Sequence, residues 1–349
     1  MMKHKVKYDL LRVFAIFGVI VIHITAYPYN YGDVYTITWK IANTYNTFFR
    51  WTVPVFFMLS GALLLNKEKI NFKLFMSKYI LKYLGIFILF TVLYAIAELK
   101  PITSIFAENR WKFIFLLFNY KYHLWFLITM IGVYLLYPIF MALKKYENGK
   151  YVIYYCVLFF VFGILSYSIK TINFEGVLEY IPTLFSNFNY ELFGYSGYFL
   201  TGYYLSNFHF PKAKIKMIVA FLFIFLITIT LSQYYVNTHG VVSTSYTNYF
   251  FIATYLESIL VFLIFNSLEG NLTTKIENIF IEMSSVTVYV YLMHVFVIEW
   301  MLKYYPKTVT HYNNVLVPFF SSLFVFGVCF LTVTTVKKFL CILKKYISN

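Results

Sequence analysis

Two side chains capable of proton transfer and anion binding stand inside the first long apolar run, YDLLRVFAIFGVIVIH. Arg12 and His23 are 11 positions apart, and at roughly 100° per residue this spacing puts both on one face of an α-helix. The rise between them is about 16 Å. Imidazole exchanges protons near neutral pH, and guanidinium binds phosphate or carboxylate groups. The spacing therefore predicts a polar line along one helix face, with Arg12 near one end and His23 deep in the helix.

Each of these residues also has a structural interpretation. His23 alone is compatible with a buried histidine bonded to a neighbouring carbonyl, and Arg12 with an anchor that snorkels to the membrane surface. Ionisable groups inside a membrane are costly and normally face a bundle interior or a wet cavity. The residues alone leave both interpretations open for Arg12 and His23, and Asp9, one turn before Arg12, is expected to orient its guanidinium.

Five further side chains are candidates to line a site: His123, Trp125, His294, Ser60 and Glu257. His123 and Trp125 are also compatible with an aromatic belt at the membrane interface. Ser60 stands beside Gly61, where small residues let helices approach closely. His294 is either a site residue or a structural hydrogen-bonding group. Glu257 and Glu299 are acids within apolar runs, and each is either functional or paired with a cation such as Arg50.

The composition indicates the surroundings of these residues. Hydrophobic residues make up 61% of the 349, aromatic residues 23% and charged residues 12%. A soluble domain carries about twice that charged share, because it must cover itself with polar surface. Apolar runs of about 20 residues recur along the chain, and each is long enough to cross about 30 Å of hydrocarbon as a helix. We therefore predict an all-α, multi-pass protein of the cell membrane, with one transmembrane domain over residues 1–349 and no soluble domain.

Ten membrane spans are predicted from these runs. They are 8–29, 45–65, 79–98, 122–143, 151–169, 188–207, 215–236, 248–267, 284–303 and 315–336. The stretch WKFIFLLF, 112–119, is too short to cross and is expected to be interfacial or re-entrant. With the N-terminus in the cytoplasm, most of the 29 lysines and arginines fall on the cytoplasmic side. The positive-inside rule and the even number of spans then put both termini in the cytoplasm.

Several classes of function are excluded by composition and motifs. The net charge of +15 reflects topology and attraction to anionic lipids, and nucleic-acid binding is not expected because no basic domain protrudes. The three cysteines form no C-x-x-C pair, so neither a disulfide framework nor a metal site is predicted. The chain lacks phosphate-loop, dinucleotide-binding and H-E-x-x-H motifs, and no permanently bound cofactor is expected.

Five blocks of the chain, in order, resemble the acyltransferase-3 family of integral membrane O-acyltransferases. The blocks are YDLLRVFAIFGVIVIH (8–23), VPVFFMLSGALLL (53–65), YHLWFL (122–127), GYFLTGYYL (197–205) and SSVTVYVYLMHVFVI (284–298). The first is similar to the family's arginine and histidine separated by ten residues, and the second to its F-F-x-x-S-G block. With ten predicted spans, the resemblance covers nearly the full length.

The resemblance implies acyl-coenzyme A as the donor substrate, bound from the cytoplasm with its phosphates near Arg12, Lys73, Lys78 and Lys82. The chain departs from the family here. The family's F-x-x-x-R-x-x-R pattern is replaced by FMSKYILKYL, with Tyr79 where the first arginine stands. Lysine offers a mobile point charge and lacks the bidentate fork of arginine.

The resemblance further implies a reaction. An acyl group, most commonly acetyl, would pass to a hydroxyl of an exported surface polysaccharide or its lipid-linked precursor, with His23 and Arg12 as the catalytic pair. His23 would either remove the hydroxyl proton or carry the acyl group transiently. The implied partners are the acyl donor, the glycan acceptor, the bilayer and a polysaccharide synthesis or export complex. The alternatives are a transporter or flippase of a lipid-linked glycan, and a membrane polymerase or structural subunit of an export complex.

Overall fold

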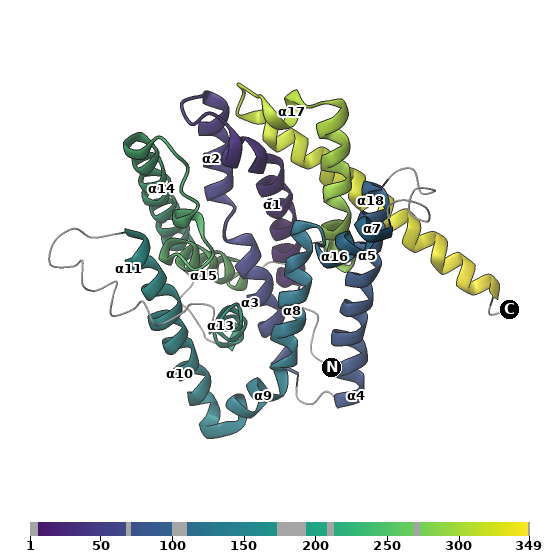
Figure 1. Ribbon diagram of the computed structural model, residues 1–349. Helices are drawn as coiled ribbons and strands as arrows, with labels where there is room; N and C mark the ends of the chain where they lie inside the picture. The colour runs from purple at the N-terminus through teal and green to yellow at the C-terminus, as the bar shows by residue number, and fades with distance from the viewer. Residues whose placement is uncertain are drawn as a thin grey trace. The chain divides into compact units, whose positions relative to one another are not determined.

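The computed structural model describes residues 6–67, 71–99, 110–172, 193–207, 213–268 and 273–347. Within these ranges every regular element is a helix (Figure 1). Nine segments of the described residues are long and apolar enough to cross a membrane: Val6–Tyr31, Ile37–Leu64, Phe72–Glu98, Trp111–Leu135, Tyr137–Ile172, Lys214–His239, Ser245–Asn266, Thr274–Tyr304 and Leu316–Leu343. The prediction of an all-α, multi-pass membrane protein is confirmed. The orientation of the termini stays a prediction.

Two of the nine segments contain an interruption at a boundary between predicted stretches. Residues 119–121 separate α7 (Arg110–Phe118) from η2 (Tyr122–Leu124) and α8 (Trp125–Leu135). The stretch 112–119 therefore forms a helix of its own, and its interfacial or re-entrant position stays a prediction. A tight turn at Tyr146–Gly149, where Glu147 and Asn148 have positive φ, follows α9 (Tyr137–Lys145). This turn separates the predicted spans 122–143 and 151–169.

The sixth predicted span, 188–207, is described only in part. Its first residues, 188–192, lie outside the described residues. The remainder contains α13 (Ser196–Asn207), which has 12 residues. A helix of that length rises about 18 Å, less than the hydrocarbon thickness of about 30 Å. This element is therefore not among the nine long segments, and its crossing stays a prediction.

The helices group into two compact units, Met1–Ala62 with Tyr155–Asn349, and Leu63–Tyr154. The first, which we call the major unit, contains most of the helices. They are α1 (Val6–Tyr31), α2 (Ile37–Phe48), α3 (Thr52–Leu64, up to Ala62), the end of α10 (Lys150–Leu158), η4 (Phe159–Leu165), α11 (Ser166–Ile172), α13, α14 (Lys214–His239), η7 (Ser245–Thr247), α15 (Ile252–Asn266), α16 (Thr274–Tyr304), α17 (Lys307–Thr310) and α18 (Leu316–Ile347). Whether both units form the single domain expected for residues 1–349 stays a prediction.

Helix α1 lies at the centre of the major unit. It packs against α2, α15, α16, α17 and α18 (Figure 1). Most of its apolar side chains are buried, among them Leu11, Ile16 and Ile20 at 0% exposure. A helix that is apolar around its circumference can face lipid or other helices, and the burial of these side chains shows that other helices cover α1. The polar residues of α1 are therefore held inside a packed bundle.

Close backbone contact joins α3 to α13. A Cβ on Gly61 would lie 1.8 Å from the carbonyl oxygen of Phe199, and one on Gly202 would lie 2.1 Å from that of Met58. Only glycine fits at both positions, and Phe57 stacks on Tyr195 beside them with ring centroids 4.5 Å apart. Two of the conspicuous sequence blocks, 53–65 and 197–205, thus pack directly on each other.

The second unit, which we call the minor unit, consists of the end of α3, α4 (Phe72–Phe75), η1 (Met76–Leu81), α5 (Lys82–Glu98), α7, η2, α8, α9, η3 (Tyr146–Gly149) and the start of α10. Helix α5 packs against α7 and α8. The element η1 is a π-helix between α4 and α5. Such wide turns inside α-helices are frequent at functional sites.

Candidate functional site

Helices α1 and α16 run side by side in the same direction. Arg12 of α1 contacts Ser284 of α16, and His23 contacts His294. The partners of the two contacts are 272 and 271 positions apart in the sequence. A later residue of α1 therefore contacts a later residue of α16, as in parallel helices. Both side chains therefore face α16, as the helical spacing predicted.

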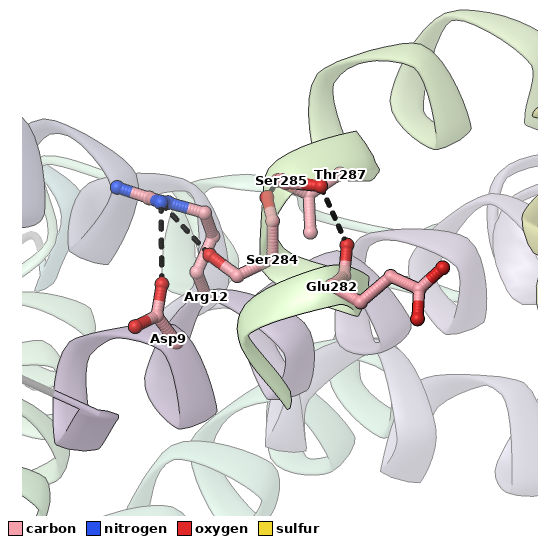
Figure 2. A network of polar contacts seen from close by, with 6 residues as sticks. All are labelled: Asp9, Arg12, Glu282, Ser284, Ser285 and Thr287. Carbon is pink, nitrogen blue, oxygen red and sulfur yellow. Dashed lines mark hydrogen bonds and ion pairs between the residues drawn. The ribbon is translucent and has the colours of Figure 1, made fainter. Parts of the chain in front are cut away.

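The Arg12 end of this pair is a small polar network (Figure 2). The Arg12 Nη1 donates to the Ser284 hydroxyl at 2.9 Å and lies 3.8 Å from the Asp9 carboxylate. The guanidinium is 29% exposed, whereas the Asp9 side chain is 8% exposed. Asp9 and Ser284 thus orient the cation from one side and leave part of it accessible. The expectation that Asp9 orients Arg12 is confirmed.

A second cation lies next to this network. Lys337 of α18 donates from its Nζ to the Ser285 hydroxyl at 2.9 Å. Ser285 in turn donates to the carbonyl oxygen of Glu282 at 2.7 Å, which Figure 2 also shows. Two adjacent serines of α16 therefore bind an arginine and a lysine. In the sequence analysis, Lys337 is only one of the lysines that indicate the cytoplasmic side.

The His23 end of the pair contains two imidazoles. The ring centroids of His23 and His294 are 4.9 Å apart, with the planes inclined by 43°. His294 is fully buried, and its Nδ1 donates to the carbonyl oxygen of Tyr291 one turn earlier, since a carbonyl can only accept. In a neutral His294 the lone pair is then on Nε2. His23 is half-buried.

Arg50 lies at a break in the second long segment, within range for its charge to act on His23. The segment Ile37–Leu64 is interrupted at residues 49–51, between α2 and α3. The Arg50 guanidinium carbon lies 5.9 Å from the ring centroid of Tyr29 and 5.7 Å from that of Tyr249. Its charge interacts with His23. The sequence analysis considered Arg50 only as a counter-ion; the available signal was a cation inside a predicted span.

The acids and Ser60 lie elsewhere in the major unit. Glu257 of α15 is 1% exposed, and its Oε1 has no hydrogen-bond partner within the described residues. No ion pair joins Arg50 to Glu257 or Glu299 in the described part of the chain, so that suggested pairing is not observed. Ser60 lies next to Gly61 at the contact between α3 and α13.

The remaining predicted site residues belong to the minor unit. His123 is fully buried in η2, with the Tyr94 ring edge-on at 5.0 Å, and Trp125 begins α8. Lys73, Lys78 and Lys82 are exposed on the continuous helix formed by α4, η1 and α5. They are available for anion binding. The structure determines no geometry between these residues and the Arg12 and His23 line.

The departure from the family's arginine pattern has a structural counterpart. Tyr79, which occupies the position of the first arginine, accepts a hydrogen bond from Lys67 Nζ at 2.7 Å on its hydroxyl. The Lys78 ammonium lies 5.9 Å from the centroid of the same ring. Two lysines therefore bring positive charge to Tyr79. The contribution of Lys67 was not anticipated from the sequence.

The arrangement in the major unit supports acid-base chemistry. No group of three or more metal-ligating side chains occurs among the described residues. The half-buried His23 imidazole packs against the His294 imidazole, and the charge of Arg50 acts on His23. Arg12 lies about 16 Å from His23 along α1. A base next to a fixed cation is suited to group transfer through an anionic intermediate.

This site belongs to a multi-pass membrane protein whose helices present a histidine pair and two arginines to a common interior. Comparison with protein families matches residues 5–334 to the acyltransferase-3 family, described as an acyltransferase domain. The chain therefore belongs to the acyltransferase-3 family and is a membrane acyltransferase. Comparisons with curated proteins and with solved structures gave no significant match.

Proposed function

We propose that this membrane acyltransferase is an O-acyltransferase of the cell membrane. It transfers an acyl group, with acetyl as the first candidate, from cytoplasmic acyl-coenzyme A to a hydroxyl of an exported surface polysaccharide or its lipid-linked precursor. One observation carries the proposal: Arg12 and His23 both face α16 from α1, Arg12 at Ser284 and His23 at His294. This line provides an anion-binding end and a basic end that an extended thioester substrate can bridge.

The proposed reaction uses His23 as general base. His23 accepts the proton of the acceptor hydroxyl while its oxygen attacks the thioester carbonyl carbon and a C–O bond forms. The tetrahedral intermediate collapses, the C–S bond breaks, and the proton returns to the coenzyme A sulfur. A positioned base of this kind contributes about 10²- to 10⁴-fold to the rate. His294 is a positioning residue, because its ring packs against that of His23 with centroids 4.9 Å apart and is itself oriented by the Tyr291 carbonyl.

A covalent path is the second chemical possibility for His23. In that path the imidazole attacks the thioester, coenzyme A leaves as the thiol, and the acyl-imidazole is then attacked by the acceptor hydroxyl. The two paths differ in one measurement. Release of one equivalent of coenzyme A in the absence of acceptor indicates the covalent path, whereas direct transfer requires the acceptor before the thiol is released.

Phosphate groups of the donor are assigned to Arg12 first. Arg12 is held by Ser284 and Asp9 with part of its guanidinium exposed, which leaves donors for a phosphate oxygen. Lys73, Lys78 and Lys82 are proposed as further phosphate contacts because of their charge and exposure. His123, Trp125, Ser60 and Glu257 are proposed from the sequence as residues that line the substrate or the site.

The test is the substitution His23→Ala in cells that make the surface polymer. We expect acyl modification of the polymer to be lost while the amount of exported polymer stays normal. His239→Ala is the matched control, because His239 is exposed at the end of α14. Loss of the exported polymer itself in His23→Ala would contradict the proposal and indicate a transporter or flippase. Full acylation in that variant would also contradict it.

A further inference from the structure

Arg50 occupies an unusual place in the membrane part of the chain. The break at residues 49–51 lies midway along the segment Ile37–Leu64, between the 12 residues of α2 and the 13 of α3. Irregular backbone at membrane depth is tolerated where it is buried in protein or lines a water-filled cavity. A charged side chain at such a depth is costly and is normally retained for a purpose.

Among the described residues, no carboxylate forms an ion pair with Arg50. Two tyrosine rings, Tyr29 and Tyr249, contact the guanidinium by cation–π interactions. Its Nε is buried and has no acceptor in the same part of the chain. Tyr29 is itself fixed, since its hydroxyl bonds to that of Thr247 at 3.0 Å. Arg50 is thus a preorganised cation that no anion neutralises within the described ranges.

Packing places this cation next to His23. Asn46, one turn before Arg50, donates from its Nδ2 to the carbonyl oxygen of Ile22 at 3.2 Å and to the Thr25 hydroxyl at 3.1 Å. These two acceptors flank His23 on α1. The Arg50 side chain then reaches the Tyr29 ring, one and a half turns after His23. Its charge interacts with His23 accordingly.

We propose that Arg50 is a catalytic residue that stabilises the negative charge formed on the thioester carbonyl oxygen during acyl transfer. When the acceptor oxygen attacks the carbonyl carbon, the carbonyl electron pair moves to oxygen and gives a tetrahedral oxyanion. Arg50 donates hydrogen bonds to this oxyanion while His23 holds the proton removed from the hydroxyl. The electron pair on the oxyanion returns to re-form the carbonyl when the C–S bond breaks. This inference rests on the proposed function.

The cation is suited to this task because its geometry is fixed before the reaction. Donors already aimed at a developing oxyanion need no reorganisation, and in a dry site they act more strongly than in water. The substrate's neutral thioester gains little from Arg50, whereas the charged intermediate gains much. Arg50 should therefore affect kcat more than KM.

The experiment compares purified full-length wild type with Arg50→Gln, Arg50→Lys and, as a matched control in the same segment, Lys40→Gln. Lys40 is an exposed cation of α2. Acyl transfer is measured from acetyl-coenzyme A to the isolated polysaccharide, and thermal unfolding reports folding. We expect Arg50→Gln to lower kcat by about 10²- to 10³-fold with KM for acetyl-coenzyme A and for the acceptor within about threefold. Arg50→Lys should recover part of the loss, and Lys40→Gln should match wild type.

Two results would overturn this role for Arg50. In one, folded Arg50→Gln retains a kcat within about threefold of wild type. In the other, KM for the acceptor rises while kcat is unchanged, which would show that Arg50 binds an anionic group of the substrate. If Arg50→Gln unfolds, Arg50→Lys decides by the same two criteria. Wild type and His23→Ala assayed together separate the two hypotheses: inactivity of wild type contradicts the proposed function, whereas active wild type with active Arg50→Gln contradicts only the role of Arg50.

Discussion

Substitution Gly61→Ala tests the contact between α3 and α13. The added Cβ would lie 1.8 Å from the Phe199 carbonyl oxygen and 2.7 Å from its carbon. Ordinary contacts begin at 3.4 Å, so the two helices must separate by about 1.5 Å along this direction. The neighbour is backbone and cannot rotate away. Overpacking of this kind costs about 1 to 3 kcal/mol, and alanine returns up to about 1 kcal/mol of helix propensity. We expect net destabilisation of about 1 to 2 kcal/mol.

Gly327→Ala is the matched control for this substitution. Gly327 lies in α18 of the same unit, and a Cβ there would have nothing within 4 Å. Only the gain in helix propensity remains, so its melting temperature should equal or exceed that of wild type. The assay is thermal unfolding of the purified protein in detergent. A Gly61→Ala protein that melts at or above wild type would refute the reasoning from the close contact.

The remaining predictions concern the line from Arg12 to His23. Ser284→Ala removes one hydrogen bond to the partly exposed Arg12, and we expect KM for acyl-coenzyme A to rise about 3- to 10-fold with kcat little changed. The adjacent variant Ser285→Ala is the control. A KM for Ser284→Ala equal to that of the control would contradict the assignment of Arg12 to the phosphates. His294→Ala removes the partner of His23, and we expect kcat to fall about 10- to 100-fold with KM unchanged and with partial rescue by His294→Gln. Steady-state kinetics of folded variants that show equal kcat for wild type and His294→Ala would exclude the positioning role.

The sequence predicted what depends on local periodicity. Apolar runs long enough to cross a bilayer can only satisfy their backbone as helices, so the helical fold followed from composition and length. The common face of Arg12 and His23 followed from the geometry of one helix. The pairing of His23 with His294 depends on how α1 packs against α16, across 271 positions of sequence. No periodicity within either helix indicates this contact; the sequence selected the two histidines separately, His23 from its spacing with Arg12 and His294 as a polar residue inside an apolar run.

The break at residues 49–51 was missed because the residues around it are apolar. The run FFRWTVPVFF continues the hydrophobic pattern through the interruption. Two local signals were present. Arg50 is a cation inside the predicted span 45–65, and Pro54 lacks an N–H and is tolerated within the first turn of a helix. Proline in the first turn of α3 thus marked the start of a new helix.

The interruption between α2 and α3 also has a consequence for biogenesis. The two helices have 12 and 13 residues and rise about 18 and 20 Å, so neither half alone can bridge about 30 Å of hydrocarbon. The translocon must therefore release both halves into the lipid as one unit. An arginine at the centre of a lone inserting helix costs about 2.5 to 3.5 kcal/mol. The rings of Tyr29 on α1 and of Tyr249 just before α15 lower that cost only after both have packed around Arg50. Insertion of the segment Ile37–Leu64 is therefore coupled to later folding of the chain.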